Sequence, residues 1–118
     1  MKVLIVDDNP DITCMLSEFL KAKGLENIIA NDPLAGLDLI KEENYDAILL
    51  DISMPEFSGI DIIDSLEREK ILQDQKIIIF SAIAITDSQI KYLLKKDGVK
   101  ACIKKPIELD KLLTAITS

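Results

Sequence analysis

Acids, one hydroxyl and one lysine follow apolar runs at four places in the chain. The run VLIV leads to Asp7 and Asp8, and the run AILL leads to Asp51. The run IIIF leads to Ser81, and a later apolar stretch leads to Lys105. A carboxylate beside an apolar core costs free energy unless something pairs with it. The chemistry of these residues therefore depends on whether the fold brings them together and on the cation that pairs with Asp51.

The elements that must position these residues alternate along the chain. Five apolar, β-rich runs occur at Lys2–Val6, Asn27–Ala30, Asp46–Leu50, Lys76–Phe80 and Ala101–Lys104. Between and after them, apolar residues recur at spacings of three and four, which is typical of amphipathic helices. Asn9 and Pro10 favour the start of the first helix, and Gly24 favours its end. The alternation predicts an α/β fold, a flavodoxin-like doubly wound (βα)5 unit with a five-stranded parallel sheet in the order 2-1-3-4-5.

In that strand order the candidate residues converge on one crevice. Ligands of such sheets bind beyond the carboxyl ends of the strands, at the point where the strand order reverses. Asp7, Asp8 and Asp51 would lie there together with Ser81 and Lys105. Three neighbouring carboxylates repel each other unless a cation lies among them, and oxygen ligands with few protein contacts suit Mg²⁺. A divalent cation and Lys105 are therefore the expected partners of Asp51.

Length and composition indicate a single domain. The chain has 118 residues, of which 48% are hydrophobic and 30% charged, so we expect one globular domain over residues 1–118. No apolar run approaches the roughly 20 residues of a membrane span, and the start of the chain does not resemble a signal peptide. The expected location is the cytoplasm. The chain stops where the fifth helix should stop, so we expect no output domain.

Charge and the absence of histidine exclude several classes of function. The net charge of −7 argues against direct binding to nucleic acid, which requires a basic surface. It suits a protein that attracts cations or basic partners. The sequence contains no histidine, which excludes histidine-based triads, histidine zinc sites and phosphohistidine carriers. Cys14 and Cys102 are interpreted as small buried hydrophobic residues.

With these motifs in place, the sequence resembles the response regulator receiver domains over its whole length. The resemblance rests on the acidic pair after the first strand and on DISMPEFSG, residues 51–59, with the spacing D-x-x-M-P-x-x-x-G. It also rests on Ser81-Ala82 after the fourth strand and on Lys105-Pro106 after the fifth. In extent the chain is similar to the stand-alone, CheY-like receivers of chemotaxis and phosphorelays.

The resemblance implies a role for each matching residue. Asp51 would be the phosphoacceptor, and Lys105 would pair first with Asp51 and then with the phosphoryl group. Ser81 would bond a phosphoryl oxygen. The metal ligands would be Asp51, Asp8 directly, Asp7 mainly through water and the backbone carbonyl of Ser53.

The cofactor and activity follow from the same resemblance. The metal would be Mg²⁺, with Mn²⁺ as a substitute. Ala82 would leave room for the phosphoryl group, and the Lys105–Pro106 peptide bond would be cis. The protein would catalyse its own phosphorylation and slow dephosphorylation without being a conventional enzyme.

The sequence departs from the family pattern at the switch. Most receivers carry Tyr or Phe three residues before the site lysine, where this chain has Cys102. On phosphorylation we therefore expect a smaller change in packing than in receivers with the aromatic residue, or a different output surface. Two results together would contradict this expectation. The Cys102→Tyr variant would show unchanged phosphorylation-dependent partner binding, and the wild-type protein would show the usual large shifts around residues 82–105. Ser53 and Ile83 occupy the positions that tune lifetime, and neither suits the orientation of an attacking water, so slow dephosphorylation is predicted.

The expected partners are a histidine kinase or phosphotransfer protein and a downstream effector. In the family, the first helix docks the phosphodonor, which points to Asp11, Ile12 and Met15 and to the loop after Lys105. Ile12 and Met15 could equally belong to the core. The face of the fourth helix with Lys91, Tyr92 and Lys95 is the alternative output surface or an ordinary solvated face. We expect no contact with nucleic acid or membrane, and a monomer, although a dimer is compatible with the sequence.

The sequence argues against three other functions. A phosphatase of the haloacid dehalogenase type needs a second acid two residues after the nucleophile, where this chain has Ser53. A flavodoxin-like FMN carrier needs a hydroxyl-rich loop and stacking aromatic residues, whereas here DDNPD follows the first strand and only five aromatic residues are present. A non-phosphorylated pseudo-receiver used as a docking module is disfavoured because suitable residue types occupy all five site positions.

Overall fold

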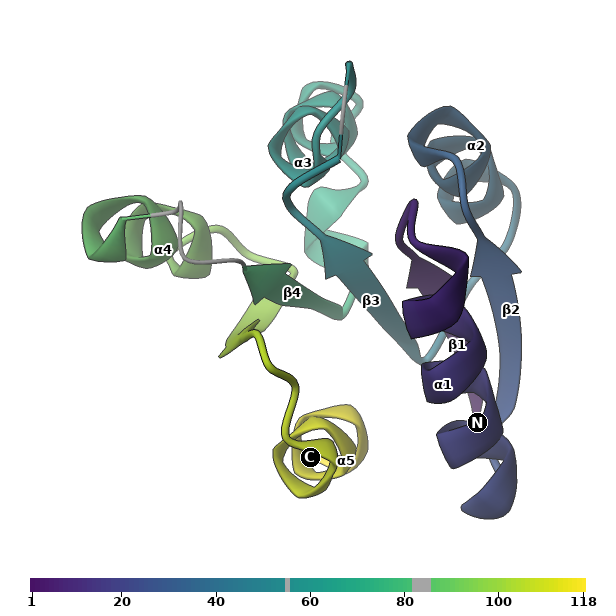
Figure 1. The fold of residues 1–118 in the computed structure, drawn as a ribbon. Coiled ribbons are helices and arrows are strands. Elements are labelled where there is room, and N and C mark those ends of the chain that lie inside the picture. Colours follow the sequence, from purple (N-terminus) through teal and green to yellow (C-terminus); the bar gives the residue numbers. More distant parts are fainter. Residues whose placement is uncertain (55, 82–85) are drawn as a thin grey trace.

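The computed structural model describes residues 1–54, 56–81 and 86–118, except for the side chain of Ser81. Strands and helices alternate along the chain (Figure 1). The strands are β1 (Lys2–Val6), β2 (Glu26–Ala30), β3 (Ala47–Asp51), β4 (Ile77–Ser81) and β5 (Val99–Lys104). The helices are α1 (Pro10–Ala22), α2 (Pro33–Glu42), α3 (Gly59–Arg68), α4 (Asp87–Leu94) and α5 (Leu109–Thr117), with a short 3₁₀ turn, η1 (Leu72–Asp74).

The five strands form one parallel sheet in the order β2-β1-β3-β4-β5. This confirms the predicted flavodoxin-like α/β fold and its strand order. β1 and β3 lie side by side in a register that pairs Val6 with Leu50. Continued by one residue, this register places Asp7 opposite Asp51. The strand order therefore brings the two acids to the same edge of the sheet, as the sequence predicted.

Helices cover both faces of the sheet (Figure 1). Successive strand residues point to opposite faces, so each strand contributes to two separate cores. Leu4, Ile48 and Ile79 belong to the core that includes residues of α2, α3 and α4. Ile5 and Leu49 belong to the other core, which lies beneath α1 and α5. Burial on both faces explains why the strand sequences are apolar throughout.

Local sequence explains where α1 and α2 begin. The Asn9 side chain accepts a hydrogen bond from the Asp11 amide at 2.9 Å, and Pro10 occupies the first helical position. Asp32 caps α2 by accepting from the Ala35 amide at 3.0 Å. α1 therefore starts at Pro10, with only Asn9 between it and the acidic pair, and ends at Ala22, just before Gly24, where φ is +77°.

The predicted strand limits needed small corrections. The third and fourth strands each begin and end one residue later than predicted, so that Asp51 and Ser81 are the last residues of β3 and β4. The second strand begins one residue earlier than predicted, at Glu26. The fifth strand begins at Val99, two residues before its predicted start. Strand ladders continue as long as backbone partners are available, even where the side chain becomes polar. Asp51 is consequently held by the sheet itself.

None of the helices in residues 1–54, 56–81 and 86–118 has the length and apolar character that crossing a membrane requires.

Candidate functional site

Asp51 ends β3 as a buried carboxylate with two positively polarised neighbours. Only 2% of its side chain is exposed. Its Oδ1 accepts a hydrogen bond from the Ser53 backbone amide at 3.1 Å and lies 3.3 Å from Lys105 Nζ. The Ser53 amide contact follows from the sharp turn after the strand, and sequence reasoning missed it because it had considered only the Ser53 carbonyl.

The acidic pair lies beside Asp51. One carboxylate oxygen from each of Asp7, Asp8 and Asp51 can be chosen so that all three lie within 4.8 Å of one another. Asp7 is completely buried, whereas Asp8 is accessible to solvent. The backbone amide of Asn9 donates to Asp7 Oδ1 at 2.9 Å, which fixes the orientation of that carboxylate. The structure therefore brings together the acids that the sequence analysis had proposed as metal ligands.

Lys105 reaches this cluster from the loop after β5. Its Nζ lies 3.6 Å from Asp7 Oδ2 as well as 3.3 Å from Asp51 Oδ1. The Lys105–Pro106 peptide bond is cis, as expected from the sequence. One ammonium group thus faces two buried carboxylates, and the accessible carboxylate of Asp8 adds a third negative charge to the same site.

The pKa of Asp7 reflects its burial and the excess negative charge of the site. Burial, followed by the negative charge of Asp51, raises the pKa of Asp7 from 3.8 to about 6. The Asn9 amide and Lys105 oppose this rise without cancelling it. Asp7 Oδ2 is buried and, among the described residues, accepts no hydrogen bond. Without a further cation, the site is therefore short of positive charge.

These observations fit a divalent cation. The donor set consists of carboxylate oxygens, which Mg²⁺ and Mn²⁺ prefer, and the cation would meet the unsatisfied oxygen of Asp7. Asp8 leaves one side open to solvent, which suits an ion that keeps several of its waters. Three carboxylates and one ammonium also leave an excess negative charge that a divalent ion balances.

Gly59 allows the chain to turn tightly behind Asp51. Its amide donates to the Ile52 carbonyl at 3.1 Å, where α3 begins. A Cβ atom at this position would lie 2.5 Å from the Asp51 carbonyl oxygen and 2.9 Å from Ile52 Cα. A side chain would therefore push the end of β3 away from α3. This is the physical reason for the glycine in the motif that begins at Asp51.

Three predicted positions cannot be placed in the site. The side chain of Ser81, together with Ala82 and Ile83, lies outside the described residues. The backbone of Ser81 is described, and it pairs with Lys104 in the β4–β5 ladder. Ser81 is therefore at the same end of the sheet as Asp51, and its role remains a prediction.

The structure corrects or resolves several surface assignments. Cys14 is exposed on α1, so its interpretation as a buried residue was wrong, because it lies on the outer side of the helix. Cys102 is half-buried and packs against the core beneath α4. Met15 is 43% exposed and does not belong to the core, whereas Ile12 is half-buried against it. Tyr92 is 62% exposed.

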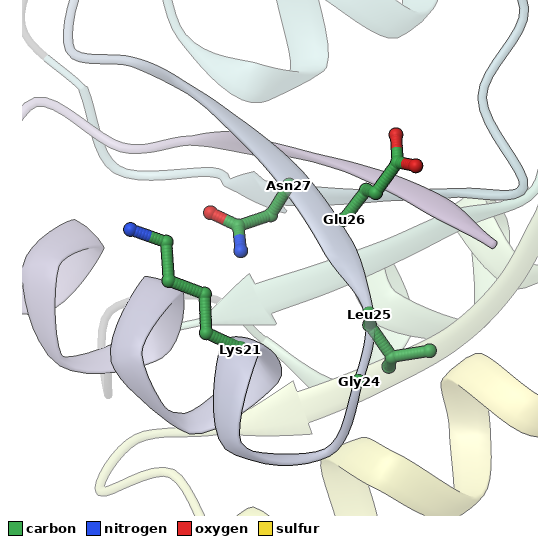
Figure 2. A pocket seen from close by; sticks show the side chains of 5 residues that line it. All are labelled: Lys21, Gly24, Leu25, Glu26 and Asn27. Carbon is green, nitrogen blue, oxygen red and sulfur yellow. The ribbon is translucent and has the colours of Figure 1, made fainter.

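A hollow of about 450 Å³ lies at the opposite end of the sheet, between the end of α1 and the start of β2. Lys21, Gly24, Leu25, Glu26 and Asn27 line it (Figure 2). It contains none of the residues that the sequence analysis had proposed for chemistry.

Comparison with known proteins identifies the family. The family model described as the response regulator receiver domain matches residues 3–117. The receiver domain of the Francisella response regulator 1452 is 31% identical, with a TM-score of 0.85, over 98% of this chain and 93% of that one. The chain belongs to the response regulator receiver domains.

Two further relatives of this receiver domain are informative. The transcriptional regulatory protein CpxR of Escherichia coli (strain K12) is 40% identical over 55 residues, which make up 47% of this chain and 23% of CpxR. The receiver domain thus matches about a quarter of the length of that protein. The response regulator TrrA from Thermotoga maritima, solved in complex with Mg²⁺ and BeF, is 29% identical with a TM-score of 0.79 over 98% of this chain and 96% of that one.

Proposed function

We propose that this receiver domain accepts a phosphoryl group on Asp51, in the presence of Mg²⁺, from a histidine kinase or a histidine phosphotransfer protein. The observation that carries the proposal is the position of the Asp51 carboxylate, which is 2% exposed and lies 3.3 Å from Lys105 Nζ. Asp7 and Asp8 supply two further carboxylates within 4.8 Å. Phosphoryl transfer requires a placed nucleophile and concentrated positive charge, which Lys105 and a metal ion held by these carboxylates would supply.

The proposed reaction needs little covalent chemistry from the protein. A carboxylate oxygen of Asp51 attacks the phosphorus of a phosphohistidine, the P–O bond forms, and the P–N bond breaks. The electron pair of the broken bond stays on the donor's imidazole nitrogen. Ser53 N–H donates to Oδ1, so an acyl phosphate on Oδ2 would leave this hydrogen bond in place.

Each neighbouring residue has a separate task in this proposal. Lys105 neutralises negative charge first on Asp51 and then on the phosphoryl group, and Ser81 donates to a phosphoryl oxygen. Asp7, Asp8, Asp51 and the Ser53 carbonyl hold the metal. When bound, Mg²⁺ or Mn²⁺ supplies positive charge that stabilises the phosphoryl oxygens. The relative TrrA, whose structure contains Mg²⁺ and BeF, supports this assignment by similarity.

Hydrolysis of the acyl phosphate would reset the domain slowly. Ser53 and Ile83 occupy the positions from which an acid or an amide would orient the attacking water, and neither has such a side chain. A phosphorylated state that persists gives time for the domain to bind an effector or to pass the phosphoryl group to another protein.

The first helix is the proposed docking surface for the phosphodonor. Asp11 is exposed, Ile12 is half-buried, and Met15 is 43% exposed. α1 begins directly after the acidic pair, so a partner on this helix and on the loop after Lys105 would hold its phosphohistidine near Asp51. The exposed α4 residues Lys91 and Tyr92 form a second candidate surface for a downstream effector.

Intact-mass spectrometry tests the proposal. The protein is incubated with acetyl phosphate or phosphoramidate, with Mg²⁺ or with EDTA. We expect one phosphoryl adduct that requires the metal and disappears in Asp51→Asn. Asp38→Asn, which removes an exposed carboxylate from α2, is the matched control and should retain the adduct. A wild-type protein that formed no adduct would favour a docking module that works without phosphorylation.

A further inference from the structure

The side-chain amide of Asn31 holds the backbone of Asp7. Asn31 follows β2, and its Nδ2 donates to the Asp7 carbonyl oxygen at 2.9 Å. The Asp7 amide donates to the Ala30 carbonyl at 3.1 Å. The backbone amide and the backbone carbonyl of Asp7 are therefore both hydrogen-bonded, to the consecutive residues Ala30 and Asn31.

Strand geometry explains why a side chain is used here. In a parallel ladder that pairs Val6 with Ala30, the next carbonyl of β1 would accept from the amide of residue 32. Residue 32 is instead the N-cap of α2, where the chain leaves the sheet. The amide of Asn31 donates to that carbonyl in place of a backbone N–H, and so extends the β1–β2 connection by one residue.

Asn31 also connects this strand end to α1. Its Nδ2 lies 2.9 Å from Thr13 Oγ1, and Thr13 is 1% exposed. The Thr13 hydroxyl in turn donates to the Pro10 carbonyl at 3.1 Å. One amide group thus joins the end of β2, the backbone of Asp7 and the first turn of α1, which are the three segments that surround the acidic pair.

We propose that Asn31 is a positioning residue for the metal site: its amide, supported by Thr13, holds the Asp7 backbone so that the acidic pair is ready to bind Mg²⁺. The inference rests on the proposed function, since it takes Asp7 and Asp8 as metal ligands. Asn31 acts through the main chain, since its amide bonds to the Asp7 carbonyl oxygen and to Thr13 Oγ1. When the amide is lost, the Asp7 backbone loses one of its two links to β2, and the carboxylates no longer keep their spacing.

Asn27 provides a matched control. It lies on β2 itself and, like Asn31, bonds to α1: its Nδ2 donates to the Ser17 carbonyl at 3.3 Å, and its Oδ1 accepts from Ser17 Oγ at 2.6 Å. Figure 2 shows its side chain extending from β2 toward α1, beside the hollow at the other end of the sheet from the acidic pair. Loss of either asparagine removes a link between β2 and α1, but only Asn31 contacts Asp7.

The experiment compares Asn31→Leu with Asn27→Leu, since leucine has nearly the shape of asparagine and cannot donate. Mg²⁺ affinity is measured by calorimetry on the full chain, and melting temperature is measured without metal. Removal of partners that orient metal ligands typically weakens affinity about 10- to 100-fold, and we expect about 3- to 10-fold for Asn31→Leu because it acts through the backbone. Asn27→Leu should change affinity less than about 2-fold while lowering the melting temperature similarly.

A readout without metal and a second pair of variants complete the test. Amide hydrogen exchange at Asp7 and Asn9 in the metal-free protein should accelerate in Asn31→Leu and stay unchanged in Asn27→Leu. Thr13→Val should weaken Mg²⁺ binding in the same direction, and Thr13→Ser, which keeps the hydroxyl, should restore it. These two variants test the same connection if Asn31→Leu does not fold.

The possible outcomes separate the two proposals. Equal Mg²⁺ affinities in the two leucine variants, with binding intact in wild type, would overturn the role of Asn31 and leave the proposed function standing. A wild-type protein that bound no Mg²⁺ would overturn both. Selective loss of affinity and of amide protection in Asn31→Leu would support both.

Discussion

Replacement of Asp7 by asparagine should stabilise the metal-free protein. Asp7 is fully buried, and its Oδ2 accepts no hydrogen bond among the described residues. An asparagine has the same shape, can still accept from the Asn9 amide and carries no charge. The substitution therefore removes repulsion with Asp51 and the cost of burying a carboxylate.

The size of the effect follows from the pKa of Asp7. The pKa is raised from 3.8 to about 6, mainly by burial and then by Asp51. A difference of this size corresponds to at most about 3 kcal/mol in the free energy of unfolding, at about 1.4 kcal/mol per pH unit. We expect about 1 to 2 kcal/mol, because the protein relaxes around a charge and the substitution also removes the ion pair with Lys105.

The sign of the pH dependence is fixed by the same shift. Between pH 3.8 and about 6 the folded wild-type protein binds more protons at Asp7 than the unfolded chain does. The contribution of Asp7 to stability therefore falls as pH rises through this window. The advantage of Asp7→Asn should be full above pH 6 to 7 and should shrink as pH falls toward 3.8.

The assay is urea unfolding in EDTA at several pH values, with Asp38→Asn as an exposed control. Asp38→Asn should change the free energy of unfolding by less than about 0.5 kcal/mol. Added Mg²⁺ should stabilise wild type and have little effect on Asp7→Asn. If Asp7→Asn were destabilised at pH 7.5 without metal, the reasoning about excess negative charge would be refuted.

Three further predictions follow from the same site. Gly59→Ala should destabilise the fold by about 1 to 3 kcal/mol in urea unfolding, because its Cβ would lie 2.5 Å from the Asp51 carbonyl oxygen. The control is Asp64→Ala, at an exposed position of α3, and equal effects of the two substitutions would contradict the steric argument. Mg²⁺ affinity measured by calorimetry should weaken as pH falls through about 6, because protonation of Asp7 competes with the metal. A constant affinity between pH 7.5 and 5 would argue against a role of Asp7 in metal binding. Met15→Asp should slow phosphoryl transfer from a protein donor and leave labelling by acetyl phosphate intact, since Met15 is 43% exposed; loss of both activities would indicate a structural role instead.

Much of the fold and the set of acids were predictable because they depend on local patterns. Apolar runs that alternate with helical periods determine a parallel sheet, and the strand order places Asp7 and Asp51 on neighbouring strands. Caps such as Asn9 are also local, since the side chain bonds to an amide two residues later. The patterns that predict each element lie within short stretches of sequence, although the strand pairs that result join distant parts of the chain.

The remaining features depend on three-dimensional contacts. Whether Met15 or Cys14 faces solvent is decided by how α1 rotates against the sheet, and the apolar period alone could not fix this. The bond from Asn31 to Asp7 joins residues 24 positions apart. An asparagine before a helix cap carries no sequence signal for such a contact. The Ser53 amide at Asp51 depends on the turn geometry after β3.

The central claim is that Asp51 is the residue that accepts the phosphoryl group. The most direct test is to phosphorylate the protein with acetyl phosphate and Mg²⁺, reduce the acyl phosphate with borohydride to homoserine, and locate the homoserine by peptide mass spectrometry. The structure predicts homoserine at position 51 alone. Homoserine at Asp8 or at another acid, or none in a protein that carries the adduct, would contradict the proposed function.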